Sequence, residues 1–160
     1  TIRGLHQVSS VRVSPDGKFV YASSALWVTE PQNLNWIATF SRDSDTGKLV
    51  WQTKLDHFQF CEFEVLTEGE THLEFSPEGD RLIASSAGAS MAIFRRDVTT
   101  GALTFGDAAC LYDNLELNIN LPGKFALDPS GYYLYIPGIA SDALAIFDTF
   151  YRVFVPSVLK

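Results

Sequence analysis

Residues 11–21 read VRVSPDGKFVY, and two later stretches repeat this pattern, LEFSPEGDRLI at residues 73–83 and FALDPSGYYLY at residues 125–135. In every copy, two strand-like segments flank a turn in which a proline precedes a glycine by two residues. Proline presets φ for the first corner of such a turn, and glycine readily adopts the left-handed conformation that closes it. Each copy is therefore predicted to form a β-hairpin.

A second type of hairpin is predicted downstream of the first. Residues 36–49 end in SRDSDTGKL, and residues 91–103 end in RRDVTTGAL. In both stretches an aspartate, Asp43 or Asp97, precedes a Thr-Gly corner, and its carboxylate can accept hydrogen bonds from N–H groups of the turn. The sequence DSDTG also resembles the start of a calcium-binding loop, but no glutamate follows at a spacing that would complete one. Turn capping is therefore the preferred interpretation.

The two hairpins together give a unit of four antiparallel strands, which is typical of a β-propeller blade. In the third unit, residues 144–148 match the second hairpin, but no Thr-Gly turn follows. No helical period is present, so the predicted fold class is all-β: a partial β-propeller of three four-stranded antiparallel blades, incomplete as a single chain. The expected boundaries are residues 5–56 for the first blade, 57–70 for a linker or outer strand, 71–115 for the second blade and 120–160 for the third, whose last strand is degenerate.

Three blades are too few for an ordinary closed propeller, which has about four to eight. Open terminal blades would expose apolar faces and strand edges, so we expect neighbouring protein to cover them. The chain is then a fragment of a larger propeller, half of a dimer, or a subunit completed by another protein chain. The first residue is Thr1 rather than methionine, so we expect the chain to be either processed or a piece of a longer one.

The composition argues against several classes of function. The 160 residues are 46% hydrophobic and 13% aromatic, which is typical of a folded globular chain, and no apolar run is long enough to insert across a membrane. With 12 Lys and Arg against 19 Asp and Glu, the net charge is −7, which argues against nucleic acid or anionic lipid as a partner. Cys61 and Cys110 fit neither a disulfide scaffold nor a zinc cluster, and they either form one bridge or remain free thiols. No metal or other cofactor is expected.

The repeats resemble those of the lactonase-type β-propellers, a family that includes the bacterial 6-phosphogluconolactonases. The resemblance rests on residues 14–21, 37–49 and 92–105, and it covers about residues 5–54 and 70–148. It implies a wheel of seven blades in the complete family member, and it favours an extracellular or periplasmic location.

Lactonases of this family often carry a histidine-containing stretch that begins six residues before the turn proline. At these positions the chain has Ser9, Thr71 and Gly123, and His72 is one residue out of register. In a strand, a shift of one residue turns the side chain to the opposite face. No residue therefore inherits a catalytic role from this motif.

His72 and Glu74 are nevertheless candidate catalytic residues, because they are two residues apart on a predicted strand and share one face. A histidine beside a carboxylate could perform general acid–base chemistry in a lactonase or an isomerase. Arg12 occupies the repeat position equivalent to Glu74, and equivalent positions in successive blades lie close together around the axis. Arg12 and Glu74 could instead form an ion pair between blades, and this structural role is the preferred interpretation.

Two further stretches are candidate interaction surfaces. Phe58 and Phe60 share one face of a predicted strand, which could pair with a partner or lead into the next blade. Trp27 precedes Asn33 and Asn35 in an inserted loop, where an aromatic ring with amides could bind a carbohydrate or a peptide, or anchor the loop. For both stretches the structural role is preferred.

Two functions are consistent with these patterns. The open ends favour a non-catalytic interaction or scaffold module that docks to another chain or forms part of a larger propeller. The alternative is a sugar-lactone hydrolase, similar to 6-phosphogluconolactonase, in which this chain supplies part of the wheel. Ring opening of gluconolactones well above the spontaneous rate would distinguish the second function from the first.

Overall fold

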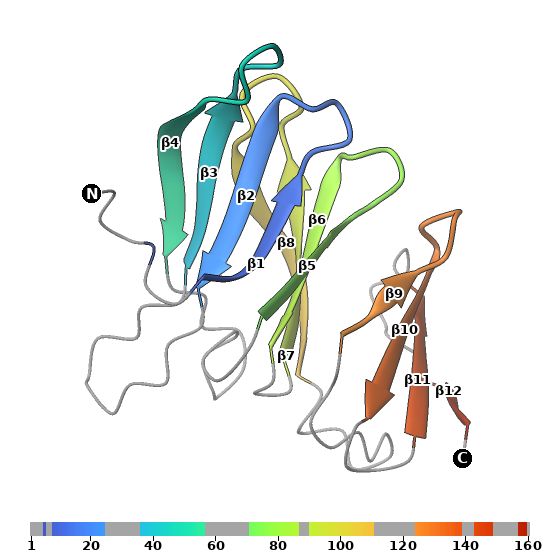
Figure 1. Ribbon diagram of the computed structural model, residues 1–160. Helices are drawn as coiled ribbons and strands as arrows, with labels where there is room; N and C mark the ends of the chain where they lie inside the picture. The colour runs from blue at the N-terminus through green and yellow to red at the C-terminus, as the bar shows by residue number, and fades with distance from the viewer. Residues whose placement is uncertain are drawn as a thin grey trace, which may run out of the picture.

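The strands form three four-stranded antiparallel sheets, which confirms the predicted all-β propeller blades (Figure 1). The computed structural model describes residues 5, 8–24, 36–56, 71–86, 90–110, 124–138, 143–148 and 157–159. None of these residues belongs to a helix of the length and apolarity needed to cross a membrane.

In each blade the four strands are neighbours in chain order, from an inner to an outer strand. Blade 1 contains β1 (Val8–Val13), β2 (Phe19–Ser24), β3 (Trp36–Arg42) and β4 (Leu49–Asp56). Blade 2 contains β5 (Thr71–Phe75), β6 (Arg81–Ser86), β7 (Ser90–Arg96) and β8 (Leu103–Cys110). Blade 3 contains β9 (Ala126–Leu127), β10 (Tyr133–Gly138), β11 (Ala143–Asp148) and β12 (Ser157–Leu159).

The inner hairpins are closed by hydrogen bonds that the residue before the turn proline accepts. In blade 1, the Ser14 hydroxyl accepts a bond from the Phe19 N–H at 3.0 Å, and the Ser14 carbonyl accepts one from the Gly17 N–H at 2.8 Å. Gly17 has a φ of 72°, a left-handed conformation that glycine adopts without a steric penalty. In blade 3, Asp128 replaces the serine, and its carboxylate accepts a bond from the Tyr133 N–H at 2.8 Å.

The outer hairpins confirm the predicted role of their aspartates. Asp43 Oδ1 accepts hydrogen bonds from the N–H groups of Asp45 and Thr46, at 3.0 and 2.8 Å. Asp97 Oδ1 does the same for Thr99 and Thr100, at 2.8 and 3.0 Å. The carboxylates thus cap their own turns.

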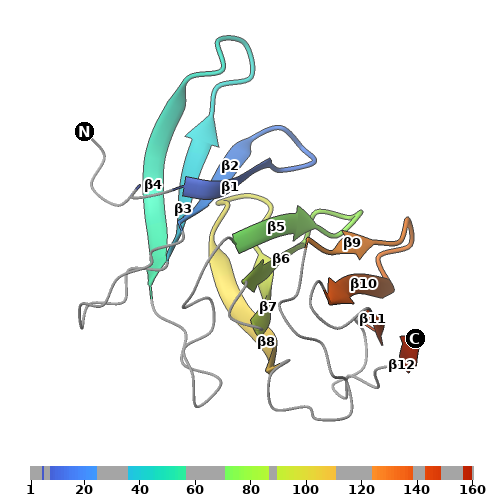
Figure 2. The same ribbon diagram turned by 60° about the horizontal axis from the view of Figure 1, so that its bottom comes forward.

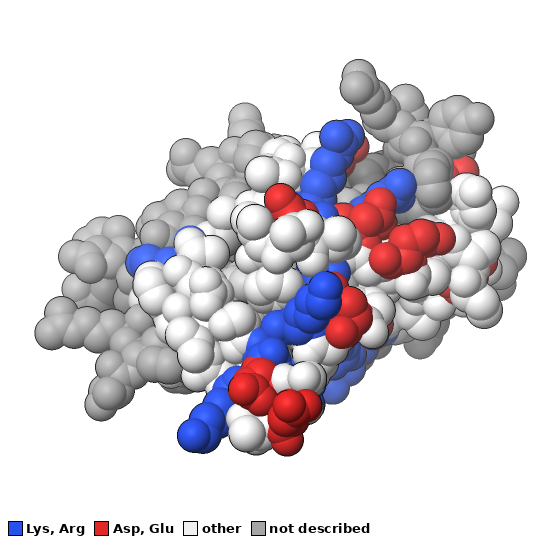
Figure 3. Space-filling view, turned by 90° about the horizontal axis from the view of Figure 1, so that it is seen from above, with Lys and Arg blue, Asp and Glu red and all other residues white. Residues whose placement is uncertain are grey.

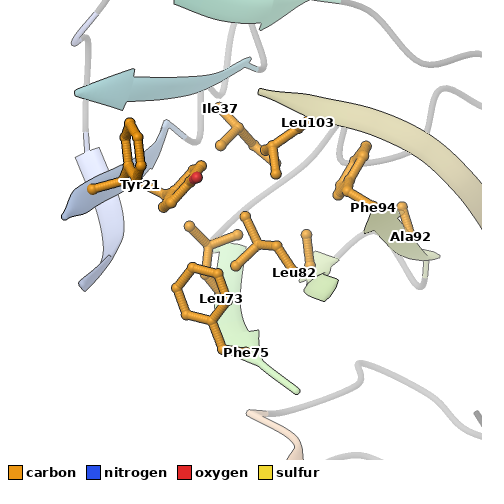
Figure 4. Packing of buried hydrophobic residues seen from close by; sticks show 10 residues of the cluster. Tyr21, Ile37, Leu73, Phe75, Leu82, Ala92, Phe94 and Leu103 are labelled. Carbon is orange, nitrogen blue, oxygen red and sulfur yellow. The ribbon is translucent and has the colours of Figure 1, made fainter. Parts of the chain in front are cut away.

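Successive blades bury their faces against each other. Between blades 1 and 2, Tyr21 and Ile37 point towards Leu73, Leu82 and Phe94, and all five side chains are almost completely buried (Figure 4). Between blades 2 and 3, a second cluster is built from residues of β6, β7, β10 and β11 and from the residue that precedes β9; its members are Ile83, Met91, Ile93, Phe125, Leu134, Ile136, Ala145 and Phe147. The repeats therefore fold as stacked units that share cores with their neighbours.

The blades fan out from their inner strands. Figure 2 shows β1, β5 and β9 following one another along the inner side of the fan, while β4, β8 and β12 lie towards its outer side. Blades 1 and 3 form the two ends of this fan. The tight turns gather at one end of the molecule, where Lys, Arg, Asp and Glu side chains of both signs are interspersed (Figure 3).

Candidate functional site

The predicted ion pair between the inner strands of blades 1 and 2 is present. Arg12 Nη2 lies 3.2 Å from Glu74 Oε2, and Arg12 Nε donates to the same oxygen at 3.4 Å. About a third of each side chain is exposed, so both groups remain in contact with solvent. Because β1 and β5 are inner strands, this pair lies towards the axis of the propeller rather than on its outer rim.

His72 lies on the same face of β5 as Glu74, as its spacing predicts. Its Nε2 is 3.9 Å from Glu74 Oε2, and its ring meets that of Phe125 from blade 3 edge-on, with centroids 4.9 Å apart. Only 14% of the His72 side chain is exposed. Arg12, Glu74 and His72 therefore form one cluster, hereafter the inner-strand cluster, to which all three blades contribute neighbours.

The surroundings of His72 favour its neutral form. Burial lowers the pKa of His72 below its ordinary value, and the positive charge of Arg12 lowers it further. The Glu74 carboxylate and a hydrogen bond with the Phe125 backbone act in the opposite direction but do not reverse the shift. The cluster thus combines an imidazole that can accept a proton with a carboxylate and a partly exposed guanidinium.

A second polar cluster joins blades 1 and 2, and the sequence patterns did not single it out. Arg96, at the end of β7, has only 1% of its side chain exposed. Its Nη2 lies 2.7 Å from Asp16 Oδ2, its Nε donates to Tyr21 Oη at 3.0 Å, and its Nη1 donates to the Gly79 carbonyl at 2.9 Å. Tyr21 Oη in turn donates to the Gly101 carbonyl at 2.7 Å. We call this set the Arg96 network.

The Arg96 network shifts the ionisation of its members. Burial raises the pKa of Asp16, but hydrogen bonds from Ser14 and Arg96 outweigh this effect and bring the pKa down to about 2. For Tyr21, burial dominates and raises the pKa of the phenol above its ordinary value. Asp16 is thus ionised, and Tyr21 protonated, at neutral pH. The contacts of the Arg96 network join blade 1 to blade 2, so its role is to hold these two blades together.

One signal in the sequence could have revealed the Arg96 network. An arginine precedes the turn aspartate in both complete outer hairpins, as Arg42 and Arg96. A charged residue that recurs at one repeat position, directly after a buried strand, is a candidate for a contact between neighbouring repeats. The other half of the pair, Asp16 with Tyr21, lies in the turn and strand that the repeat had already identified.

The remaining candidate residues are not placed by the structure. Trp27, Asn33, Asn35, Phe58 and Phe60, the two predicted interaction surfaces, lie outside the described residues. Among the side chains that the structure describes, no three His, Cys, Asp or Glu groups are arranged to hold a metal ion.

The four-stranded antiparallel sheets, which pack face to face on shared cores, place the protein in the class of β-propellers. The model of the family "Lactonase, 7-bladed beta-propeller" matches residues 1–114, and the chain belongs to this family. The resemblance of the repeats is thereby confirmed. No curated protein matches the chain.

Solved structures share the fold at low sequence identity. The chain is similar to a putative 6-phosphogluconolactonase from Bacteroides uniformis, with 19% identity and a TM-score of 0.65, over 94% of this chain and 39% of that one. It is also similar to a periplasmic gluconolactonase from Pseudomonas aeruginosa, with 20% identity and a TM-score of 0.63, over 94% and 38%. A protein from Lactobacillus plantarum matches with 16% identity and a TM-score of 0.67, over 96% and 40%. The chain spans about two fifths of the length of these relatives.

Proposed function

We propose that the protein is a sugar-lactone hydrolase and that this chain supplies part of the wall around its substrate. The observation that carries the proposal is the inner-strand cluster, in which a largely neutral imidazole lies beside a carboxylate and a partly exposed guanidinium. Membership of the lactonase family supports it, as do the names of two structural relatives. The predicted scaffold role remains a prediction, and the same assay decides between the two.

The chemistry requires a base and a stabiliser of negative charge. Water attacks the lactone carbonyl carbon while its proton passes to the His72 imidazole, and the carbonyl oxygen becomes an oxyanion. The tetrahedral intermediate then collapses, the bond from the carbonyl carbon to the ring oxygen breaks, and that oxygen takes the proton back from His72. The products are an open-chain acid and regenerated imidazole.

The other two side chains of the cluster have supporting roles in this scheme. Arg12 donates to Glu74 through Nε and Nη2 and to the Val11 carbonyl through Nη1, which leaves N–H groups for an oxyanion or an acidic sugar substituent. Glu74 stabilises the imidazolium that forms during the reaction, because its Oε2 is 3.9 Å from His72 Nε2.

The test is the rate of ring opening of δ-gluconolactone and of its 6-phosphorylated form by the purified protein. Acceleration above the spontaneous rate is expected, with His72→Gln lowering kcat/KM by about 10²- to 10⁴-fold, the usual contribution of a general base. Val98→Thr is a matched control, because this residue is exposed in the turn between the outer strands β7 and β8, whereas the cluster lies on inner strands. No acceleration by the wild-type protein, or equal rates for His72→Gln and Val98→Thr, would reject the proposal.

A further inference from the structure

A buried serine of blade 1 is bonded to the inner strand of blade 2 at the centre of the inner-strand cluster. Ser10 lies in β1, and it is only 8% exposed. Its hydroxyl accepts a hydrogen bond from the Leu73 N–H at 3.1 Å. Leu73 stands between His72 and Glu74 in β5, so this bond fixes the backbone that carries both side chains.

The Leu73 N–H has no partner within its own sheet. β5 is the innermost strand of blade 2 and pairs only with β6. The Ser76 N–H donates to the Arg81 carbonyl across this hairpin, and residues of an antiparallel pair alternate in the side to which their backbone groups point. Leu73 therefore directs its N–H away from β6, and its side chain is completely buried. Because a buried donor without a partner is unfavourable, the Ser10 hydroxyl has a defined task.

The same link recurs between blades 2 and 3. Ser10 and His72 both lie five residues before a turn proline, and Leu73 and Phe125 both lie four residues before one. His72 has a hydrogen bond with the backbone of Phe125, as Ser10 has with that of Leu73. The cluster is therefore held from both sides, by blade 1 through Ser10 and by blade 3 through Phe125.

Ser10 also fixes β5 relative to Arg12. The two residues are two positions apart on β1, with no register shift between them, so they share one face of the strand. β1 thus contacts β5 at two levels, through Ser10 and through the ion pair of Arg12 with Glu74 at 3.2 Å. The ion pair joins two long, partly exposed side chains, whereas the other contact joins a short side chain to backbone in the interior. The buried bond is the more rigid of the two.

We propose that Ser10 is a positioning residue, which acts through the Leu73 N–H to set where His72 and Glu74 lie relative to Arg12. Ser10 makes no contact with the substrate in this scheme, because its hydroxyl is buried and already bonded to backbone. The effect on turnover rests on the proposed lactonase activity, but the position of His72 can be measured without it.

The first test is the pKa of His72, followed by NMR titration of the imidazole signal that is absent from His72→Gln. The charged groups that act on this ring are Arg12 from β1, Glu74 from β5 and Lys124 from the segment before β9. In Ser10→Ala, β5 is released from blade 1, so water reaches the ring and Arg12 moves away. Burial and the charge of Arg12 both lower the pKa of His72, so this pKa should rise towards its ordinary value. Ser10→Thr keeps the hydroxyl and should keep the wild-type pKa.

The second test is the rate of ring opening of δ-gluconolactone. Ser10→Ala should lower kcat by about 10- to 100-fold, because a displacement of about 1 Å between reacting groups has an effect of this size. The pH at which kcat/KM rises should move in the same direction as the pKa of His72. Ser10→Thr should recover most of the lost rate, which a role that does not involve the hydroxyl would not predict.

Ser76→Ala is the matched control. Ser76 is 4% exposed, and its hydroxyl accepts a hydrogen bond from the Arg81 N–H at 3.1 Å, within the turn of blade 2. This variant should lower the urea midpoint by an amount comparable to Ser10→Ala, but leave kcat and the pKa of His72 at their wild-type values.

An unchanged pKa of His72 in Ser10→Ala, or the same change in Ser76→Ala, overturns the proposal whether or not the wild-type protein opens lactones. Failure of Ser10→Thr to restore the pKa also overturns it. Absence of ring opening by the wild-type protein rejects the proposed lactonase activity alone, and the titration then decides the role of Ser10.

Discussion

The Arg96 network predicts a specific dependence of stability on Asp16. Arg96 is 1% exposed and shares its donors among Asp16, Tyr21 and Gly79, so removing the carboxylate leaves a buried cation with only neutral acceptors. The change Asp16→Asn keeps the shape and one acceptor atom and removes the charge. It should therefore lower the free energy of unfolding without disrupting the turn.

The magnitude follows from the pKa of Asp16, which is about 2 in the folded protein against an ordinary value of 3.8. Each unit corresponds to about 1.36 kcal/mol, which gives roughly 2 kcal/mol at neutral pH. Solvent screens part of this, because 28% of the Asp16 side chain is exposed. We expect a loss of about 1–2 kcal/mol, or about 0.5–1 M in the urea midpoint of unfolding at pH 7.

The matched control is Glu78→Gln. Glu78 is the residue of blade 2 that corresponds to Asp16, but the residue of blade 3 that corresponds to Arg96 is Thr149, which carries no charge. This variant should change stability by less than about 0.5 kcal/mol. Because the folded-state pKa of Asp16 is depressed, its contribution is complete well above pH 3.8 and is lost as the pH falls towards 2. The gap between wild type and Asp16→Asn should therefore narrow below about pH 4. Equal losses for the two variants, or a gap that does not change with pH, would refute the reasoning.

Two further predictions concern the contacts between blades. Gly101→Ala should lower the free energy of unfolding by about 3 kcal/mol or more, because the new Cβ atom would collide with the Phe19 ring and the φ of 74° is unfavourable for alanine. Gly47→Ala should lower it only by the cost of placing alanine at a positive φ, about 1–2 kcal/mol. Urea unfolding of both variants measures the difference. The wild-type protein should also lose stability as the pH falls below 6.5, because His72 takes up a proton more readily in the unfolded chain than in the folded one. Thermal melts between pH 7 and pH 5 should therefore depend less on pH in His72→Gln than in the wild type. Identical profiles would contradict the lowered pKa of His72 in the folded protein.

Much of the fold could be predicted because each repeat carries its own turn chemistry. The pairs Pro15 with Gly17 and Asp43 with Gly47 mark two hairpins, and these marks recur at a fixed order along the chain. The bulges could not be predicted: the register shifts between Thr39 and Phe40 in blade 1, and at the same repeat position in blade 2, with no proline to mark them. A bulge depends on how two strands pair, which local sequence does not determine.

The candidate site was predicted in part. Alternation along a strand placed His72 beside Glu74, and the repeat placed Arg12 opposite them, because both arguments need only the period of a strand and the order of the blades. The edge-on contact of His72 with Phe125 was out of reach, since it joins blades 2 and 3 across the packed faces. The burial of Arg96 was also missed, because the turn sequence that follows it is typical of an exposed loop and only the recurrence of arginine at positions 42 and 96 indicates a contact between repeats.

The contact of Arg96 with Tyr21 has a consequence for how the blades assemble. The three blades are near-copies, so during folding any one of them could settle on the wrong neighbour or exchange places with its counterpart in another molecule. If blade 2 docked against the face of a second blade 2, Arg96 would be buried beside Ile83 instead of Tyr21, with no phenol oxygen to accept the hydrogen bond from its Nε. The buried cation of Arg96 therefore favours a neighbouring blade that carries a tyrosine and disfavours one that does not. In this way it helps to fix the order of blades whose sequences are otherwise similar.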